Sequence, residues 1–177
     1  MKLRQNVFTA LFAAALCVLA PLAVPMGFVP VTLATLGVYL AAGLLGPWRG
    51  TAAVGLYLLL GAVGAPVFAG FAGGVQQLVG LTGGYLWGYL LCALTAGLLL
   101  RHSRRPVRVP VWLAVGTAVL YAAGTGWYWW QTGGTPGAAV AACVLPFLRA
   151  DMLKIAVATA LILPLRERVR RLAAMDM

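Results

Sequence analysis

Asp151 and Lys154 stand three residues apart within an otherwise apolar stretch near the C-terminal end of the sequence. That spacing brings both side chains to one face of a helix. The chain has only three acidic residues, and the other two, Glu167 and Asp176, lie in a polar tail. Charges inside a membrane cost about 3 kcal/mol on insertion scales and mark ligand sites or transport pathways. The pair therefore predicts a ligand site, with a structural ion pair near the outer interface as the alternative.

A glycine-rich segment, residues 61–85, is the second candidate for ligand contact. Glycine lets the backbone approach a ligand closely, and irregular backbone at membrane depth is tolerated only where it is buried or lines a cavity. Gln76, Gln77, Thr82 and Tyr85 supply neutral hydrogen-bonding groups in this segment. The alternative is a flexible outer loop.

Arg149, two residues before Asp151, is either an interfacial anchor or a lid over the ligand.

Other kinds of chemistry find little support in the residues. The single histidine, His102, lies in a basic segment far from Asp151, so no Ser/His/Asp set can be assembled. The sequence holds no metal-ligand cluster, and it lacks the G-x-x-x-x-G-K-[ST] loop that would bind ATP. An intramembrane enzyme that uses Asp151 as a general acid or base is therefore only a minor alternative.

The composition is that of a membrane protein. Hydrophobic residues make up 63% of the 177 positions and charged residues 9%, whereas soluble domains carry about 25% charged residues. The mean hydropathy is +0.96. The net charge of +10 comes from short basic clusters between apolar stretches, which does not fit the continuous basic face of a nucleic-acid binder. We expect a lipid environment and no nucleic acid.

Six apolar segments are long enough to be spans at roughly 20 residues each, with short ones tilted. The expected spans are residues 7–24, 32–45, 51–64, 82–100, 111–128 and 148–165, with a structured loop at 65–81 and a short interfacial or re-entrant helix at 137–145. Six spans put almost all basic clusters on one side, as the positive-inside rule requires. The sequence thus predicts an all-α polytopic membrane protein, a single domain over residues 1–177, with six transmembrane helices, both termini cytoplasmic and an outward-facing ligand pocket.

Small residues recur on the first span. Ala10 and Ala14 are four residues apart, and small-xxx-small faces let two membrane helices pack closely. In a helix so rich in alanine, chance explains the spacing equally well.

Together, several motifs resemble the biotin-binding S component (BioY family) of energy-coupling-factor (ECF) transporters. The motifs are Pro30-Val-Thr, Gly43-Leu-Leu-Gly-Pro, Tyr57-Leu-Leu-Leu-Gly-Ala-Val-Gly-Ala-Pro-Val-Phe68, Gly73-Gly74, Thr82-Gly-Gly-Tyr85, and Leu145-Pro-Phe followed by Asp151 and Lys154. The sequence departs from the usual family pattern at Ala34, Ala72 and Leu81. These departures concern which polar groups hold the far end of the ligand.

The resemblance implies a prokaryotic plasma-membrane protein that binds biotin, has no catalytic activity and needs no cofactor. It also implies a membrane coupling subunit and two ATP-binding subunits as partners, with Ala10 and Ala14 facing the coupling subunit. In the family the acid and lysine of the last helix contact biotin, which corresponds to Asp151 and Lys154. The same architecture with a different vitamin is the main alternative.

The chemistry of biotin suits these residues. A carboxylate accepts from the N–H groups of the ureido ring and an ammonium donates to its carbonyl, in charged hydrogen bonds worth roughly 1.5–3 kcal/mol each. Phe68, Tyr39 and Tyr85 are candidates for an apolar wall around the thiophane ring and tail. Arg149, Gln76 or Gln77 would receive the carboxylate. The reverse orientation, with the carboxylate on Lys154, stays open.

Overall fold

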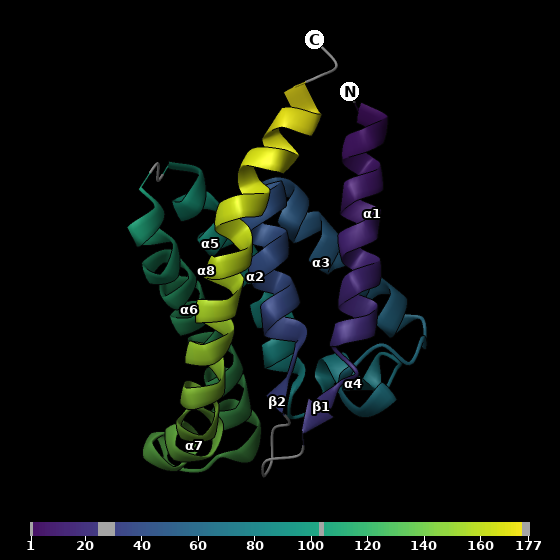
Figure 1. Cartoon of the computed structure of the whole chain (residues 1–177). Helices are drawn as coiled ribbons and strands as arrows, with labels where there is room; N and C mark the ends of the chain where they lie inside the picture. Colours follow the sequence, from purple (N-terminus) through teal and green to yellow (C-terminus); the bar gives the residue numbers. More distant parts are fainter. Residues whose placement is uncertain (1, 25–30, 103–104, 175–177) are drawn as a thin grey trace.

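The computed structural model describes residues 2–24, 31–102 and 105–174, which form a bundle of helices (Figure 1). Six longer helices make up most of it, in the order α1 (Lys2–Leu19), α2 (Ala34–Leu45), α3 (Pro47–Ala62), α5 (Gly83–His102), α6 (Val109–Thr132) and α8 (Leu145–Ala174). Two shorter α-helices, α4 (Gln76–Val79) and α7 (Pro136–Cys143), and two 3-10 turns, η1 (Ala69–Phe71) and η2 (Pro106–Arg108), connect them.

The start of α1 and the end of α8 lie at the same end of the bundle (Figure 1). At the opposite end lie α4, α7 and a small antiparallel ribbon of β1 (Ala23–Val24) and β2 (Val31–Thr32), in which Ala23 pairs with Thr32. The prediction of an all-α chain is therefore correct except for this ribbon.

The first predicted span is too long. It runs to residue 24, whereas α1 ends at Leu19 and Ala23–Val24 form a strand. Pro21 and Pro25 explain the difference, because proline lacks a donor for the helix and pushes the residue before it toward extended backbone.

The other helix boundaries shift by a few residues. The third helix begins at Pro47, four residues before the predicted span, because Gly46 takes a positive φ of 80° and proline is favoured at the first helical position. The expected loop at 65–81 contains η1 and α4. Helix α8 includes Pro164 and continues beyond the predicted end at residue 165 to Ala174. The predicted short helix at 137–145 corresponds to α7.

The core lies between α2, α3, α5 and α6, with α1 and α8 packed on its sides. Glycines allow α5 and α6 to approach closely. A Cβ on Gly84 would lie 2.2 Å from Cβ of Trp127, and one on Gly124 would lie 2.5 Å from the ring of Tyr85. This close packing fixes Tyr85, a predicted site residue, against α6.

Within the described residues, two segments are long and apolar enough to cross a membrane, Gly83–His102 and Pro106–Thr132. Two further apolar helices, Leu3–Leu19 and Ala34–Leu45, are shorter. Four of the six predicted spans thus overlap apolar helices of the described residues.

Candidate functional site

The pair that the sequence singles out is buried and in contact. Asp151 and Lys154 lie near the start of α8, with exposed fractions of 3% and 7%. The Lys154 ammonium donates to Oδ1 of Asp151 at 2.8 Å. A buried charge pair is stable only when its other hydrogen-bonding positions are also filled, so the neighbouring helices decide what the pair can do.

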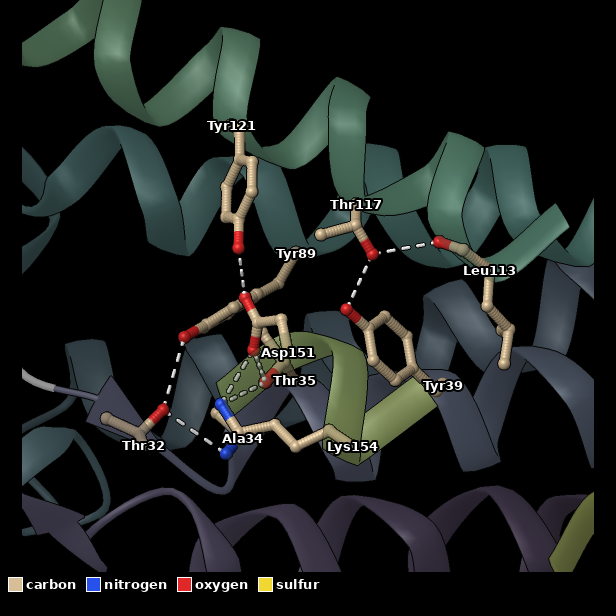
Figure 2. A network of polar contacts seen from close by, with 10 residues as sticks. All are labelled: Thr32, Ala34, Thr35, Tyr39, Tyr89, Leu113, Thr117, Tyr121, Asp151 and Lys154. Atoms are coloured by element: carbon tan, nitrogen blue, oxygen red, sulfur yellow. Dashed lines mark hydrogen bonds and ion pairs between the residues drawn. The ribbon is translucent and has the colours of Figure 1, made fainter. Parts of the chain in front are cut away.

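Thr35 from α2 and Tyr121 from α6 complete the network (Figure 2). The Thr35 hydroxyl accepts from Lys154 Nζ at 2.9 Å and donates to Oδ1 of Asp151 at 3.3 Å. The Tyr121 hydroxyl donates to the other carboxylate oxygen, Oδ2, at 2.6 Å. Three helices therefore hold one carboxylate in a fixed orientation.

The network leaves room for a ligand. A carboxylate offers about four acceptor positions and an ammonium three donors. Asp151 accepts three hydrogen bonds within the protein, and Lys154 donates two. Among the contacts of the described residues, one acceptor position of Asp151 and one N–H of Lys154 therefore have no partner. A neutral group that carries an N–H next to a C=O fits this arrangement.

The pair forms part of the wall of a cavity of about 250 Å³, which we call the polar cavity. It lies toward the end of the bundle that holds the ribbon, α4 and α7, and its lining joins hydroxyl groups to an apolar and aromatic surface. The lining residues are Thr32, Thr35, Phe68, Ala69, Gln77, Thr82, Tyr85, Leu86, Tyr89, Leu120, Tyr121, Phe147, Asp151 and Lys154. Six of the predicted ligand-binding residues are among them: Phe68, Gln77, Thr82, Tyr85, Asp151 and Lys154.

Hydrogen bonds and ring contacts hold the aromatic wall in place. The Tyr85 hydroxyl donates to the Cys143 carbonyl at 2.9 Å, and its ring lies 6.4 Å from that of Phe147. Phe68 packs edge-on against Tyr57 with ring centroids 5.6 Å apart. These rings are fixed before any ligand arrives, which lowers the entropy cost of binding.

Two predicted residues lie away from the cavity lining. Tyr39 is fully buried, and its hydroxyl bonds Thr117 at 2.6 Å. Since Thr117 donates its own proton to the Leu113 carbonyl at 2.8 Å, Tyr39 is the donor (Figure 2). It joins α2 to α6 next to the network. Arg149 is exposed on α8.

Three predicted residues shape the glycine-rich loop and do not line the cavity. Gln76 is exposed, and its amide donates to the Gly73 carbonyl at 2.8 Å. A Cβ on Gly73 would lie 2.4 Å from the Ala65 carbonyl oxygen. Gly74 has a φ of 98°, a conformation that favours glycine. Close backbone packing accounts for Gly73 and backbone conformation for Gly74.

Sequence reasoning missed four hydroxyl groups of the cavity: Thr32, Thr35, Tyr89 and Tyr121. The hydroxyl oxygens of Thr32 and Tyr89 lie 3.4 Å apart, and Thr32 also accepts from the Ala34 N–H at the start of α2. Polar residues four apart in apolar helices were the available signal, since Thr35 precedes Tyr39 by four positions and Thr117 precedes Tyr121 by four.

The family model of the BioY family matches residues 1–171. The chain belongs to the BioY family. A biotin transporter BioY of Thermotoga maritima is 39% identical over 93% of this chain and 97% of its own length. A biotin transporter BioY of Rhodobacter capsulatus is also 39% identical, over 87% of this chain and 88% of its own.

A solved structure of the S-component for biotin from an ECF-type ABC transporter superposes with a TM-score of 0.87 at 27% identity, covering 94% of this chain and 92% of that one. The BioY resemblance inferred from sequence motifs is thus confirmed. Members of the BioY family are membrane transport components, so the prediction that the chain is not an enzyme is confirmed as well.

Proposed function

We propose that this chain is the biotin-binding S component of an ECF-type transporter and that biotin binds in the polar cavity. The observation that carries the proposal is the buried Asp151–Lys154 pair, which lines the polar cavity and, within the described residues, keeps one acceptor position and one N–H unfilled. Membership in the BioY family and the likeness to biotin transporters and to an S-component for biotin support biotin as the ligand.

The ureido ring of biotin matches that pair. Its carbonyl accepts the remaining N–H of Lys154, and one ring N–H donates to the open position on Asp151. The second ring N–H finds an acceptor in the hydroxyl oxygen of Tyr121, which donates to Asp151 and retains its lone pairs. All three polar groups of the ring are then satisfied, as burial requires.

The lining of the cavity indicates where the other parts of biotin bind. The thiophane ring and aliphatic tail lie against Tyr85, Leu86 and Phe147, which are buried and apolar. The carboxylate lies near Gln77 and Thr82, which line the cavity where the glycine-rich loop meets α5. No cofactor or metal takes part in this scheme.

In the membrane, we place six spans (α1, α2, α3, α5, α6 and α8) with both ends of the chain in the cytoplasm and the polar cavity facing outward. The whole chain then acts as one multi-pass domain of a prokaryotic plasma membrane. The positive-inside rule supports this orientation, because Arg49, Arg101 and Arg166 line one cavity and Arg49 bonds to Gln5 near the start of α1, at the end of the bundle where α8 also ends.

Transport needs partners, because this sequence carries no P-loop for ATP. We place the ECF membrane coupling subunit on the face of α1 that carries Ala10 and Ala14, with the two ATP-binding subunits behind it. Both alanines are exposed on α1, whereas Ala13 beside them is buried. An exposed face of small residues suits close contact with a partner helix.

Calorimetric titration of the detergent-purified protein with biotin and a panel of other vitamins tests the proposal. Biotin should give saturable heat at one site per chain, and the other vitamins should give none. Heat from another vitamin in the absence of a biotin response would overturn the assignment and favour an S component of different specificity.

A further inference from the structure

A second cavity, of about 410 Å³, lies at the end of the bundle where α1 begins and α8 leaves, opposite the polar cavity. Three arginines from three helices line it: Arg49 of α3, Arg101 of α5 and Arg166 of α8. Among the side chains that the structure describes, its lining includes no acidic residue. We call it the basic cavity; the biotin scheme makes no use of it.

Neutral groups hold two of these arginines in place. Arg49 donates through Nη2 to the side-chain oxygen of Gln5 on α1. Arg166 donates through Nη2 to the backbone carbonyl of Leu100 at 2.7 Å. Arg101 lies exposed in the last turn of α5. Arg49 and Arg101 come from different helices and yet line one cavity, and like charges brought together favour an anion between them.

The start of α3 adds a second positive feature to the same wall. Its N-cap, Gly46, has no side chain to bond the first backbone N–H groups, and its first turn holds no acidic residue. The 16-residue helix therefore directs uncapped N–H groups toward the wall formed by Gly46, Pro47 and Trp48, next to the last turn of α2, which lines the same cavity. Phosphate groups bind at such positions.

The remaining wall is apolar. Leu44, Leu45 and Leu100 line the cavity, and Trp48 beside it is 69% exposed. Tryptophan at the end of a membrane helix marks the level of the lipid headgroups. A ligand that fits both parts of the wall carries a phosphate and a hydrocarbon chain, and basic pockets between membrane helices at this level bind anionic headgroups.

We propose that the basic cavity binds the phosphate of an anionic phospholipid, held by Arg49, Arg101 and the start of α3. The site is separate from the polar cavity, so it is independent of the ligand that the polar cavity takes. Its location at the headgroup level rests on the proposed six-span arrangement.

Native mass spectrometry of the full chain, released from micelles with added phosphatidylglycerol or phosphatidylcholine, tests this. The wild type should retain one phosphatidylglycerol in preference to phosphatidylcholine. The double variant R49Q/R101Q should bind phosphatidylglycerol roughly 25-fold more weakly, at about fivefold for each basic residue. The matched control, R105Q/R108Q, removes the same charge from exposed residues outside the cavity lining and should bind as the wild type does.

Equal losses in the two double variants would show general surface attraction and overturn the proposal, as would equal retention of the two lipids by the wild type. Displacement of the lipid by millimolar inorganic phosphate would assign the cavity to a soluble phosphate compound and overturn the lipid assignment. Thermal unfolding checks that each variant is folded. If R49Q/R101Q does not fold, R101Q alone should show a fivefold loss, because that side chain is exposed.

Discussion

Removing either member of the Asp151–Lys154 pair should weaken biotin binding by at least about 2 kcal/mol, or roughly 30-fold in Kd. Lys154→Ala deletes the 2.8 Å bond to Asp151 and the 2.9 Å bond to Thr35, and it takes the donor away from the ureido carbonyl. Asp151 then keeps only neutral donors, Thr35 and Tyr121, in a buried wall. Asp151→Asn keeps the size of the side chain. Its amide N–H groups would then face the ring N–H groups of biotin, which need an acceptor.

The double variant Asp151→Asn/Lys154→Ala distinguishes the loss of this charge pair from general damage to the fold. Because it leaves no buried charge without a partner, it should lose less affinity than the sum of the two single variants. Leu153→Ala is the matched control, since Leu153 lies between the pair in sequence but is 68% exposed. It should bind biotin as the wild type does. Thermal unfolding should show that all variants fold, because the core packs without this pair.

Calorimetry with biotin and with an analogue that lacks the ureido oxygen gives the readout. The wild type should bind the analogue poorly, whereas Lys154→Ala should hardly distinguish it from biotin. If Lys154→Ala still prefers biotin by the full wild-type margin, the lysine does not contact that oxygen, and the carboxylate becomes its better partner. Losses that add in the double variant would refute the coupling between the two charges.

Three further predictions concern the rest of the chain. Ala14→Leu should block transport in the assembled transporter yet leave biotin binding unchanged, with Ala15→Leu as the control one position away; an equal loss of binding would mean that the face belongs to the fold. Hydrogen exchange across residues 70–79 should slow when biotin saturates the protein, and unchanged exchange would remove the idea that this loop closes over the site. Gly84→Ala should lower stability by about 1–3 kcal/mol, because its Cβ would lie 2.2 Å from a tryptophan of α6. Gly126→Ala should not lower stability, because nothing lies within 4 Å of the added Cβ. Equal thermal unfolding of the two variants would contradict the packing argument.

The sequence predicts the helices well because apolar composition and proline positions are local signals. The sequence marks Asp151 and Lys154 as site candidates because charges are costly, and therefore rare, in an apolar membrane helix. The β1–β2 ribbon is missed because two short strands carry no periodicity, and only the prolines around residues 21–25 mark the break in the helix.

The hydroxyl partners of the pair are harder to predict. Thr35 and Tyr121 come from helices whose apolar residues dominate the pattern, and their meeting with Asp151 depends on how α2, α6 and α8 pack. Tyr39 and Tyr121 both follow a threonine by four residues, yet Tyr121 lines the cavity and Tyr39 bonds to Thr117. Rotation of each helix about its axis separates the two outcomes, and the sequence alone does not determine it.

A crystal structure of the biotin complex tests the central claim most directly. The ureido oxygen should lie about 3 Å from Nζ of Lys154, with a ring N–H at a similar distance from the Asp151 carboxylate. The thiophane ring should lie against Tyr85 and Phe147. Biotin bound outside the polar cavity, or with neither charged residue within hydrogen-bonding distance, would contradict the account.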